Sequence, residues 1–144
     1  MKGLRCALLL SLACVTPVPA LAEPFDVAVE VSGLRAAKGR VLVALHDDRW
    51  AFPSRWERAV ASAGIVAQEG TVTVTLRLPR PGRFALIVVH DEDADGRMKK
   101  NALGLPREGY ATGRNASELE FPLFEPALRD WTLGTRVGVR VLYP

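Results

Sequence analysis

TVTVTLRLPRPGRFALIVVHDED, residues 71–93, contains the pattern that decides the fold. Valine and leucine alternate with threonine and arginine through residues 71–78, and this period of two puts the apolar side chains on one face of a strand. Residues 83–90 are apolar at almost every position, which is typical of a strand covered on both faces. Proline and glycine between the two segments predict a turn. The stretch therefore predicts a half-exposed strand followed by a central one.

The same alternation recurs in three other segments, at residues 25–32, 41–45 and 136–141. Strands at this spacing, with few helices, favour an all-β fold, an antiparallel β-sandwich of about seven strands. One short helix is expected, because Ser54 and Glu57 have the spacing of a capping box and Gly64 follows as a stop. The apolar face of this helix would consist of Trp56, Ala59, Val60 and Ala63.

The N-terminus has the composition of a secretory signal peptide. Lys2 and Arg5 precede an apolar run at residues 6–15, and Ala20-Leu21-Ala22 supplies the small residues that a signal peptidase reads. The run is shorter than the about 20 residues of a transmembrane helix. We therefore expect residues 1–22 to be a signal peptide and residues 23–144 to be a single domain, periplasmic or secreted, without a transmembrane segment.

Both cysteines, Cys6 and Cys14, belong to this expected signal. A lipoprotein anchor at Cys14 is disfavoured, because Ser11 stands where such signals usually carry leucine. The mature domain would therefore have no disulfide and no thiol chemistry. Its stability would come from a hydrophobic core, which a chain of this length can form.

Charge and motifs narrow the functional classes. Removal of the signal takes away two cations and no acid, so the formal charge falls from +3 to +1. The remaining cations are interspersed with acids, which excludes the basic stripe of a nucleic-acid-binding protein. No serine nucleophile elbow, HExxH pair, phosphate loop or CxxC motif is present.

Five segments follow one another in a recognisable order: VEVSGL at 29–34, GRVLVALHD at 39–47, Phe52, LPRPGRFALIVVHDEDADGRMKKNALGLPREGYATGRNA at 78–116, and FEPA at 124–127. In this order they resemble the bacterial exported proteins of domain-of-unknown-function family 2141. The resemblance covers nearly the whole mature chain, and it implies a transthyretin-like or immunoglobulin-like sandwich with no established activity. The chain departs from the family pattern at Lys99, where the family often has aspartate, and at Ala111-Thr112, where it often has Gly-Phe.

Residues 91–96, DEDADG, place aspartates at alternate positions with a glycine directly after them. This matches the first half of a calcium loop, in which alternate carboxylates turn onto one cation. An EF-hand is excluded, because the last ligand position of its loop would be Ala102, which has no side-chain oxygen. The alternative is an acidic turn held by its own side-chain to backbone hydrogen bonds. The candidate metal ligands in the loop at 91–108 are Asp91, Asp93, Asp95, Asn101 and Glu108.

Two histidines stand at the ends of predicted strands, each directly before an aspartate. His46 precedes Asp47, and His90 precedes the acidic loop. If the two strand ends were neighbours, His46, Asp47 and His90 would form a second metal site or an acid/base pair. The alternative is that a neighbouring carboxylate satisfies each ring.

Aromatic residues gather around the start of the predicted helix, at Trp50, Phe52 and Trp56. Exposed aromatic rings can stack on sugars or anchor a protein partner, whereas buried rings would fix the helix to the sandwich. Trp50, Tyr110 and Asn115 are accordingly the candidate ligand contacts, with a carbohydrate or another envelope protein as the partner. Tyr110 has the alternative role of a packing residue in a long loop.

The sequence thus favours a non-catalytic binding or structural module of the bacterial cell envelope, with the acidic loop as its functional edge and Ca²⁺ as the candidate cofactor. The alternative is a metal-dependent periplasmic enzyme that uses the cluster of His46, Asp47 and His90.

Overall fold

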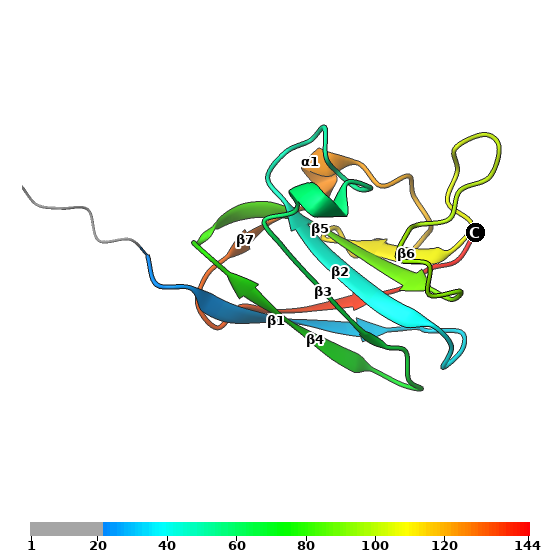
Figure 1. Ribbon diagram of the computed structural model, residues 1–144, viewed down its shortest axis with the longest axis horizontal. Helices are drawn as coiled ribbons and strands as arrows, with labels where there is room; N and C mark the ends of the chain where they lie inside the picture. Colours follow the sequence, from blue (N-terminus) through cyan, green and yellow to red (C-terminus); the bar gives the residue numbers. More distant parts are fainter. Residues whose placement is uncertain (1–21) are drawn as a thin grey trace, which may run out of the picture.

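Two β-sheets pack face to face in the computed structural model, which describes residues 22–144 (Figure 1). Residues 1–21 of the expected signal peptide lie outside the described residues, and so does the lipoprotein position Cys14. The strands are β1 (Phe25–Ser32), β2 (Arg40–His46), β3 (Ala61–Val66), β4 (Val72–Leu78), β5 (Gly82–Asp91), β6 (Gly109–Thr112), β7 (Leu128–Trp131) and β8 (Arg136–Arg140). One sheet has the order β4-β1-β8, and the other has the order β3-β2-β5-β6 with β7 also paired to β5. The prediction of an all-β sandwich is confirmed.

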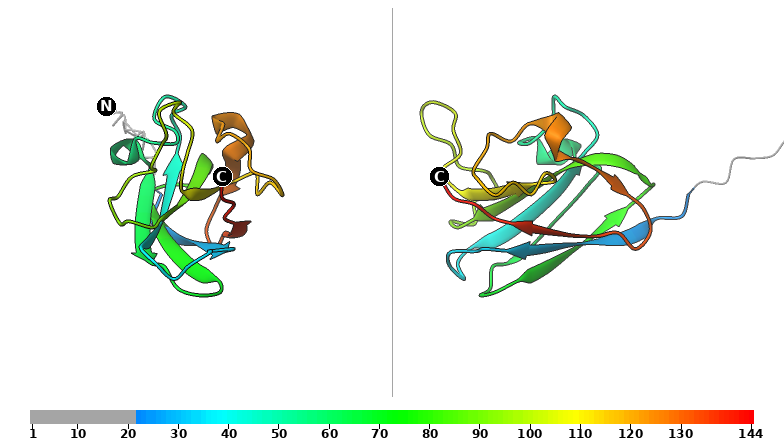
Figure 2. Two further views of the ribbon diagram at one scale, coloured as in Figure 1. Left: turned by 90° about the vertical axis from the view of Figure 1, so that its right-hand side faces the viewer. Right: turned by 180° about the vertical axis from the view of Figure 1, so that it is seen from behind.

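The alternation in the sequence builds the main core between the sheets. β1 pairs with β4 antiparallel from Phe25↔Leu78 to Val31↔Val72, so the apolar residues of both strands share one face. Those residues are buried, whereas Thr73, Thr75 and Arg77 between them are exposed. A second apolar cluster lies on the outer face of the five-stranded sheet, beneath the loops and short helices that Figure 2 shows on that side. It consists of Ala44, Ile87, Val89, Met98 and Tyr110, with Phe52, Trp56 and Ala59 packed against them.

β5 is the central strand, as its apolar sequence predicts. β2 runs along one of its edges, and β7 and β6 share the other edge one after the other. Every residue from Phe84 to Asp91 is buried. The acidic loop therefore begins at a fully enclosed position rather than at an open strand end.

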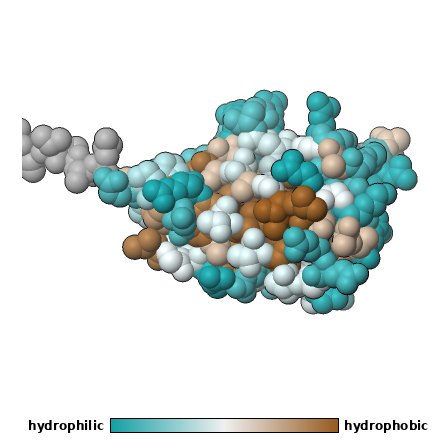
Figure 3. All heavy atoms as spheres, turned by 60° about the horizontal axis from the view of Figure 1, so that its bottom comes forward, coloured by the Kyte–Doolittle hydropathy of each residue, from teal (hydrophilic) through white to brown (hydrophobic). Residues whose placement is uncertain are grey.

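One strand pair departs from the antiparallel arrangement. β8 runs parallel to β1, from Ala28↔Arg136 to Ser32↔Arg140. Beyond β8, Leu142 pairs with Tyr110 of β6, and this bridge links the two sheets. On the opposite side β3 and β4 belong to different sheets and are not paired, and Ala63 and Ile65 of β3 are only partly buried against the core. Figure 3 brings the lower side of Figure 1 forward, and an apolar area lies in the middle of this face.

The prediction of a helix between Ser54 and Gly64 is wrong. Only a 3-10 turn, η1 (Trp56–Arg58), forms there, without a side-chain cap, and the edge strand β3 follows it. β3 pairs with β2 from Leu45↔Ala61 to Arg40↔Val66, so its backbone groups bond to a neighbouring strand. Short apolar runs fit either period, and strand pairing overrides the local helix preference here.

The short helix of the sandwich lies elsewhere in the chain, at α1 (Phe124–Ala127), which contacts β5. It is a single turn of four residues. Among residues 22–144, no helix has the length and apolar character needed to cross a membrane.

The register of β4 predicts opposite outcomes for two adjacent substitutions. Val74→Asp puts an unpaired carboxylate at a position that is 1% exposed, and we expect the free energy of unfolding to fall by more than about 3 kcal/mol. Thr73→Asp changes an exposed position of the same strand, and the free energy should change by less than about 1 kcal/mol. Urea unfolding of both variants is the measurement. Equal losses would contradict the register.

Candidate functional site

The acidic loop starts from the buried Asp91 at the end of β5. One oxygen of its carboxylate accepts a hydrogen bond from the amide of Asp95 at 3.1 Å, and the other accepts one from the amide of Gly96 at 2.8 Å. Gly96 has φ +77°, a left-handed conformation that glycine adopts without strain. The chain therefore folds back over Asp91, as the sequence alternative of a turn held by side-chain to backbone bonds requires.

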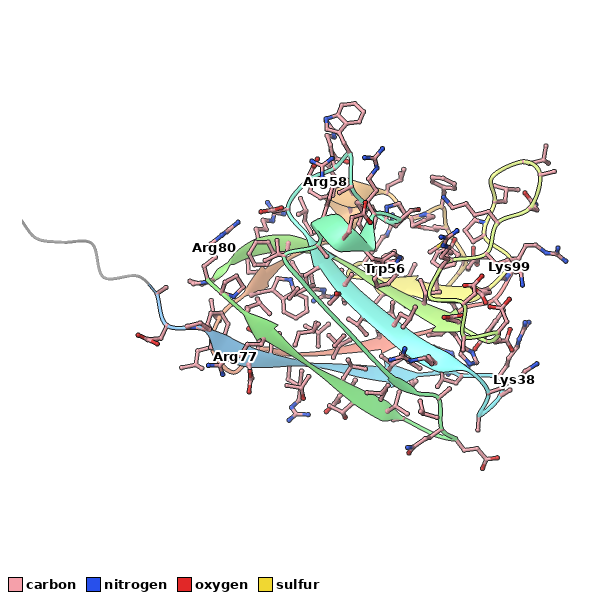
Figure 4. The ribbon with its side chains drawn as sticks, in the orientation of Figure 1. Lys38, Trp56, Arg58, Arg77, Arg80 and Lys99 are labelled. Atoms are coloured by element: carbon pink, nitrogen blue, oxygen red, sulfur yellow. The ribbon has the colours of Figure 1, made fainter. Side chains whose placement is uncertain are left out.

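This folding back brings three carboxylates together. One oxygen each of Asp91, Asp93 and Asp95 lies within 4.8 Å of the others. Oxygens that share one Ca²⁺ at about 2.3–2.6 Å are separated by up to about 5 Å, so the group has the dimensions of a cation site. Asp91 is buried, and the other two are exposed. Lys99, which Figure 4 labels, forms an ion pair with Asp93, and its hydrogen bond lowers the pKa of the Asp93 carboxyl.

Glu108, which is buried, ties the two ends of the loop together. Its carboxylate accepts hydrogen bonds from the amides of Glu92 at 3.1 Å and Lys99 at 3.0 Å. Burial raises the pKa of Glu108, the two amides lower it, and the negative charges of Asp91 and Asp93 raise it further. Glu108 therefore adds negative charge near the three aspartates, although it is not one of the group that lies within 4.8 Å.

Asn101 does not join the carboxylates. Its side-chain oxygen accepts hydrogen bonds from the amides of Leu103 at 2.9 Å and Leu105 at 3.0 Å. It shapes the outer part of the loop, where Lys100 and Pro106 form an isolated bridge. Of the five candidate ligands, the structure gathers three, places Glu108 behind them and gives Asn101 a separate role.

The two histidines lie far apart, because β2 and β5 are antiparallel. His46 is opposite Ala85, whereas His90 is opposite Val41, five positions or about 17 Å along the sheet. The two residues also face opposite sides of the sheet, since successive side chains alternate. Asp47, the third member of the expected cluster, is ion-paired with Arg80 at 2.7 Å. The structure therefore does not bring His46, Asp47 and His90 together.

His90 is held by two partners, neither of them a carboxylate. Its Nε2 lies 2.8 Å from the carbonyl oxygen of Lys38, which can only accept, so Nε2 carries the proton. Its Nδ1 lies 2.6 Å from the hydroxyl of Tyr143 and, in the neutral ring, accepts a hydrogen bond from it, while the hydroxyl oxygen accepts a hydrogen bond from the amide of Arg35. Both ring nitrogens are used, so His90 has a structural role in this arrangement.

His46 has no such partners. The residue is fully buried, its ring packs edge-on against Phe52 with centroids 5.8 Å apart, and neither ring nitrogen has a hydrogen-bond partner in the described part of the chain. Burial lowers the pKa of His46, and the charges of Asp47, Asp48 and Glu57 oppose this only in part. The ring is therefore neutral at pH 7 and resists protonation.

The candidate ligand contacts separate into exposed and structural residues. Trp50 stands at a loop tip with 81% of its surface exposed. Tyr110 is buried in the outer cluster, and its hydroxyl donates a hydrogen bond to the carbonyl of Glu120. It also borders an open pocket of about 300 Å³ whose lining is part apolar and part charged. The side-chain oxygen of Asn115 accepts a hydrogen bond from the amide of Arg140 at 3.0 Å, and this bond fastens the segment at 114–123 to β8.

Sequence reasoning missed a groove between the turn at 54–57 and the loop at 96–100. It has a volume of about 380 Å³ and is lined by Ser54, Trp56, Glu57, Gly96, Arg97, Met98 and Lys100. The sequence pattern predicts Trp56 on the apolar face of a helix, and that prediction gives no indication that the residue lies beside the loop at 96–100. The basic run at 97–100, directly after the acidic turn, was the signal that could have indicated the groove.

Comparison with protein families finds one match. A family described as "Uncharacterized protein conserved in bacteria (DUF2141)" matches residues 29–133, which include the acidic loop and every strand except part of β1 and the whole of β8. Comparison with curated proteins and with solved structures finds no match.

Burial of an unpaired His46 predicts acid sensitivity. Its pKa is lower in the folded than in the unfolded chain, so stability is complete above the unfolded value of about 6.5 and is lost as pH falls from there toward the folded value. The loss should approach about 1.4 kcal/mol for each pH unit in this range. Urea unfolding from pH 8 to pH 5 should show this loss of unfolding free energy for the wild type. His46→Leu should remove the part of the loss that comes from protonation of His46. Identical pH profiles for the two proteins would contradict the prediction.

Proposed function

The chain belongs to the DUF2141 family of uncharacterised bacterial proteins, and from this premise we propose that it is an exported, non-catalytic binding module of the cell envelope whose acidic turn binds a hard divalent cation such as Ca²⁺. The observation that carries the proposal is the convergence of one oxygen each from Asp91, Asp93 and Asp95 within 4.8 Å. The charged start, apolar run and Ala-Leu-Ala end of residues 1–22 support export to the periplasm or the medium.

The balance of charge at the turn favours a divalent cation. Three aspartates and the buried Glu108 surround the turn, and Lys99 is the cation paired with one of them. Backbone amides donate to Asp91 and, from Arg97, to Asp95, and a divalent cation would further offset the repulsion among carboxylates this close. The Lys99 side chain is half-exposed, so a metal ion that enters the turn can displace its ammonium group into solvent.

The buried Asp91 supplies the rigidity that such a site needs. Each of its oxygens accepts one amide and keeps a second lone pair for a metal ion. A hard cation takes about six to eight oxygen ligands, so backbone carbonyls and water would complete the set. The turn is thus shaped before the cation binds, which lowers the entropic cost of binding.

The sandwich itself supports a binding role in general terms. We assign it to the transthyretin-like and immunoglobulin-like class, in which two sheets hold loops of variable sequence at their ends. A fold of this class serves many functions, so the proposal rests on the acidic turn rather than on the fold. A His-based metalloenzyme has less support, because His46 and His90 lie at opposite ends of the β2–β5 pair.

Calcium should stabilise the protein. At a concentration of about 100 times Kd, a bound cation adds about 2.7 kcal/mol, which for a domain of this size raises Tm by roughly 10 °C. A thermal melt with millimolar CaCl₂ and one with chelator should differ by this amount in the wild type. In the double variant Asp93→Asn with Asp95→Asn, the two melts should coincide.

Asp47→Asn is the matched control, because Asp47 is a partly exposed, ion-paired carboxylate outside the turn. This variant should retain the full calcium response. If calcium shifts Tm of the wild type no further than that of the double variant, the turn is not a cation site.

Export predicts a defined N-terminus. Mass spectrometry of the protein recovered from the periplasm or medium of a bacterial host should give a chain that begins at Glu23. A lipid-modified Cys14, or an intact Met1 on protein retained in the cytoplasm, would refute the proposal of a soluble exported form.

A further inference from the structure

The groove between the two loops on the outer face of the five-stranded sheet has the size of a small-molecule site. Its volume of about 380 Å³ lies within the range of roughly 300–1,000 Å³ that ligand pockets occupy. A second hollow of about 210 Å³ shares Trp56 and Gly96 with it and extends over β2 and β3, where it is lined by Leu42, Ser62, Ala63 and Gly64. The two hollows together form an elongated depression with Trp56 on their common wall.

Trp56 supplies a flat apolar surface in this depression. This residue, which is the first of η1 and is labelled in Figure 4, is partly exposed, packs on the outer apolar cluster and lines the groove together with the loop at 96–100. Its indole N–H is buried and has no acceptor within residues 22–144. Packing therefore orients the ring, and it is the partly exposed ring face, not the buried N–H, that the groove offers to a ligand. An aromatic face with polar groups around it is the arrangement that binds the C–H face of a sugar ring.

The charges of the groove favour an anionic ligand. Arg97 and Lys100 have no ion-pair partner among the described residues, whereas nearby Lys99 and Arg58 are paired with Asp93 and Asp48. Lys100 donates a hydrogen bond to the hydroxyl of Ser54 at 3.1 Å, which places its ammonium group across the groove. Glu57 is the single carboxylate that lines the groove, so the lining has a net positive charge.

We propose that this groove binds a saccharide whose pyranose ring carries an anionic group, either a carboxylate or a phosphate. The ring stacks on Trp56, the anionic group pairs with Arg97 and Lys100, and Ser54 and Glu57 bond to hydroxyl groups. The proposal rests on the proposed function, since it names the ligand of the binding module. The groove adjoins the acidic turn at Gly96, but none of the three aspartates lines it.

The test uses three defined probes with the mature protein in the presence of chelator: digalacturonate, glucose-6-phosphate and maltose. Isothermal titration and the change in tryptophan fluorescence measure binding. At least one of the two anionic sugars should bind at least about tenfold more tightly than the neutral maltose, and its affinity should fall with added salt. The ratio between the two anionic sugars identifies the preferred group. Absence of binding, or equal binding of maltose, would overturn the proposal.

Variants locate the site. The double variant Arg97→Gln with Lys100→Gln should weaken binding of the preferred anionic sugar at least about tenfold, because it removes two exposed cations without touching the core. Trp56→Leu should weaken binding of the same sugar while keeping an apolar residue on the outer cluster. Circular dichroism and thermal melts establish that each variant is folded.

Two matched controls lie just outside the groove. Trp50→Leu removes an exposed indole from the loop between β2 and η1. Arg107→Gln removes an exposed cation from the loop between β5 and β6, which also carries Arg97 and Lys100. Both should bind the sugar as the wild type does. If either control weakens binding as much as the groove variants, the ligand lies elsewhere on this face and the assignment is wrong.

The two proposals fail in different ways. A protein that melts higher with calcium but binds none of the three sugars retains the cation site and refutes the groove. A protein that binds an anionic sugar in chelator but shows no calcium response refutes the cation site and supports the groove.

Discussion

The structure depends on the enclosure of β5. Residues 84–91 are buried on both faces, β2 lies along one edge, and β7 and β6 lie along the other. A strand in this position can carry almost no polar side chain without a partner. The two polar residues that end the strand, His90 and Asp91, accordingly have hydrogen-bond partners. The acidic turn is therefore anchored in the core by its first residue, while its other carboxylates stay in solvent.

Close contacts between loops and strands explain why glycine stands at particular places. A Cβ on Gly109 would lie 2.2 Å from the ring of Tyr143, the residue whose hydroxyl holds His90. A Cβ on Gly39, which has φ +70°, would lie 2.0 Å from the carbonyl oxygen of Asp91. The turn before β2 thus packs directly on the end of β5, and the first residue of β6 packs on Tyr143. The acidic turn owes its position to this packing as well as to its own hydrogen bonds.

The outer face of the five-stranded sheet concentrates the features that a binding module needs. Of the eight large apolar side chains that are exposed among residues 22–144, six lie in the connections at 47–55, 92–108 and 113–123, at Trp50, Leu103, Leu105, Leu119, Phe121 and Leu123. The acidic turn and the cationic groove lie side by side in the same connections, with opposite charges separated by Gly96. The outer face of the three-stranded sheet, by contrast, has threonines and ion pairs between neighbouring strands, such as Arg77 with Asp26 and Arg136 with Glu30. The two proposed sites thus lie on the opposite side of the sandwich from this polar face.

The sequence by itself determined the fold class and five of the strands, including the central position of β5, because period-two burial depends on neighbouring residues. It also placed an acidic loop directly after β5, with a turn held by its own side-chain bonds as one of two alternatives. It did not determine β3, whose short apolar run fits a helix or a strand until β2 offers its edge. It also could not decide whether His46 and His90 meet, because that depends on strand direction and register between segments about 40 residues apart. The groove at Trp56 arises from two loops that are distant in the chain, which the hydrogen bond from Lys100 to Ser54 and the shared packing of Met98 and Trp56 hold together. Which strands and loops pair with one another was decided only by the tertiary structure, because the repeat pattern of a segment does not specify its distant partner.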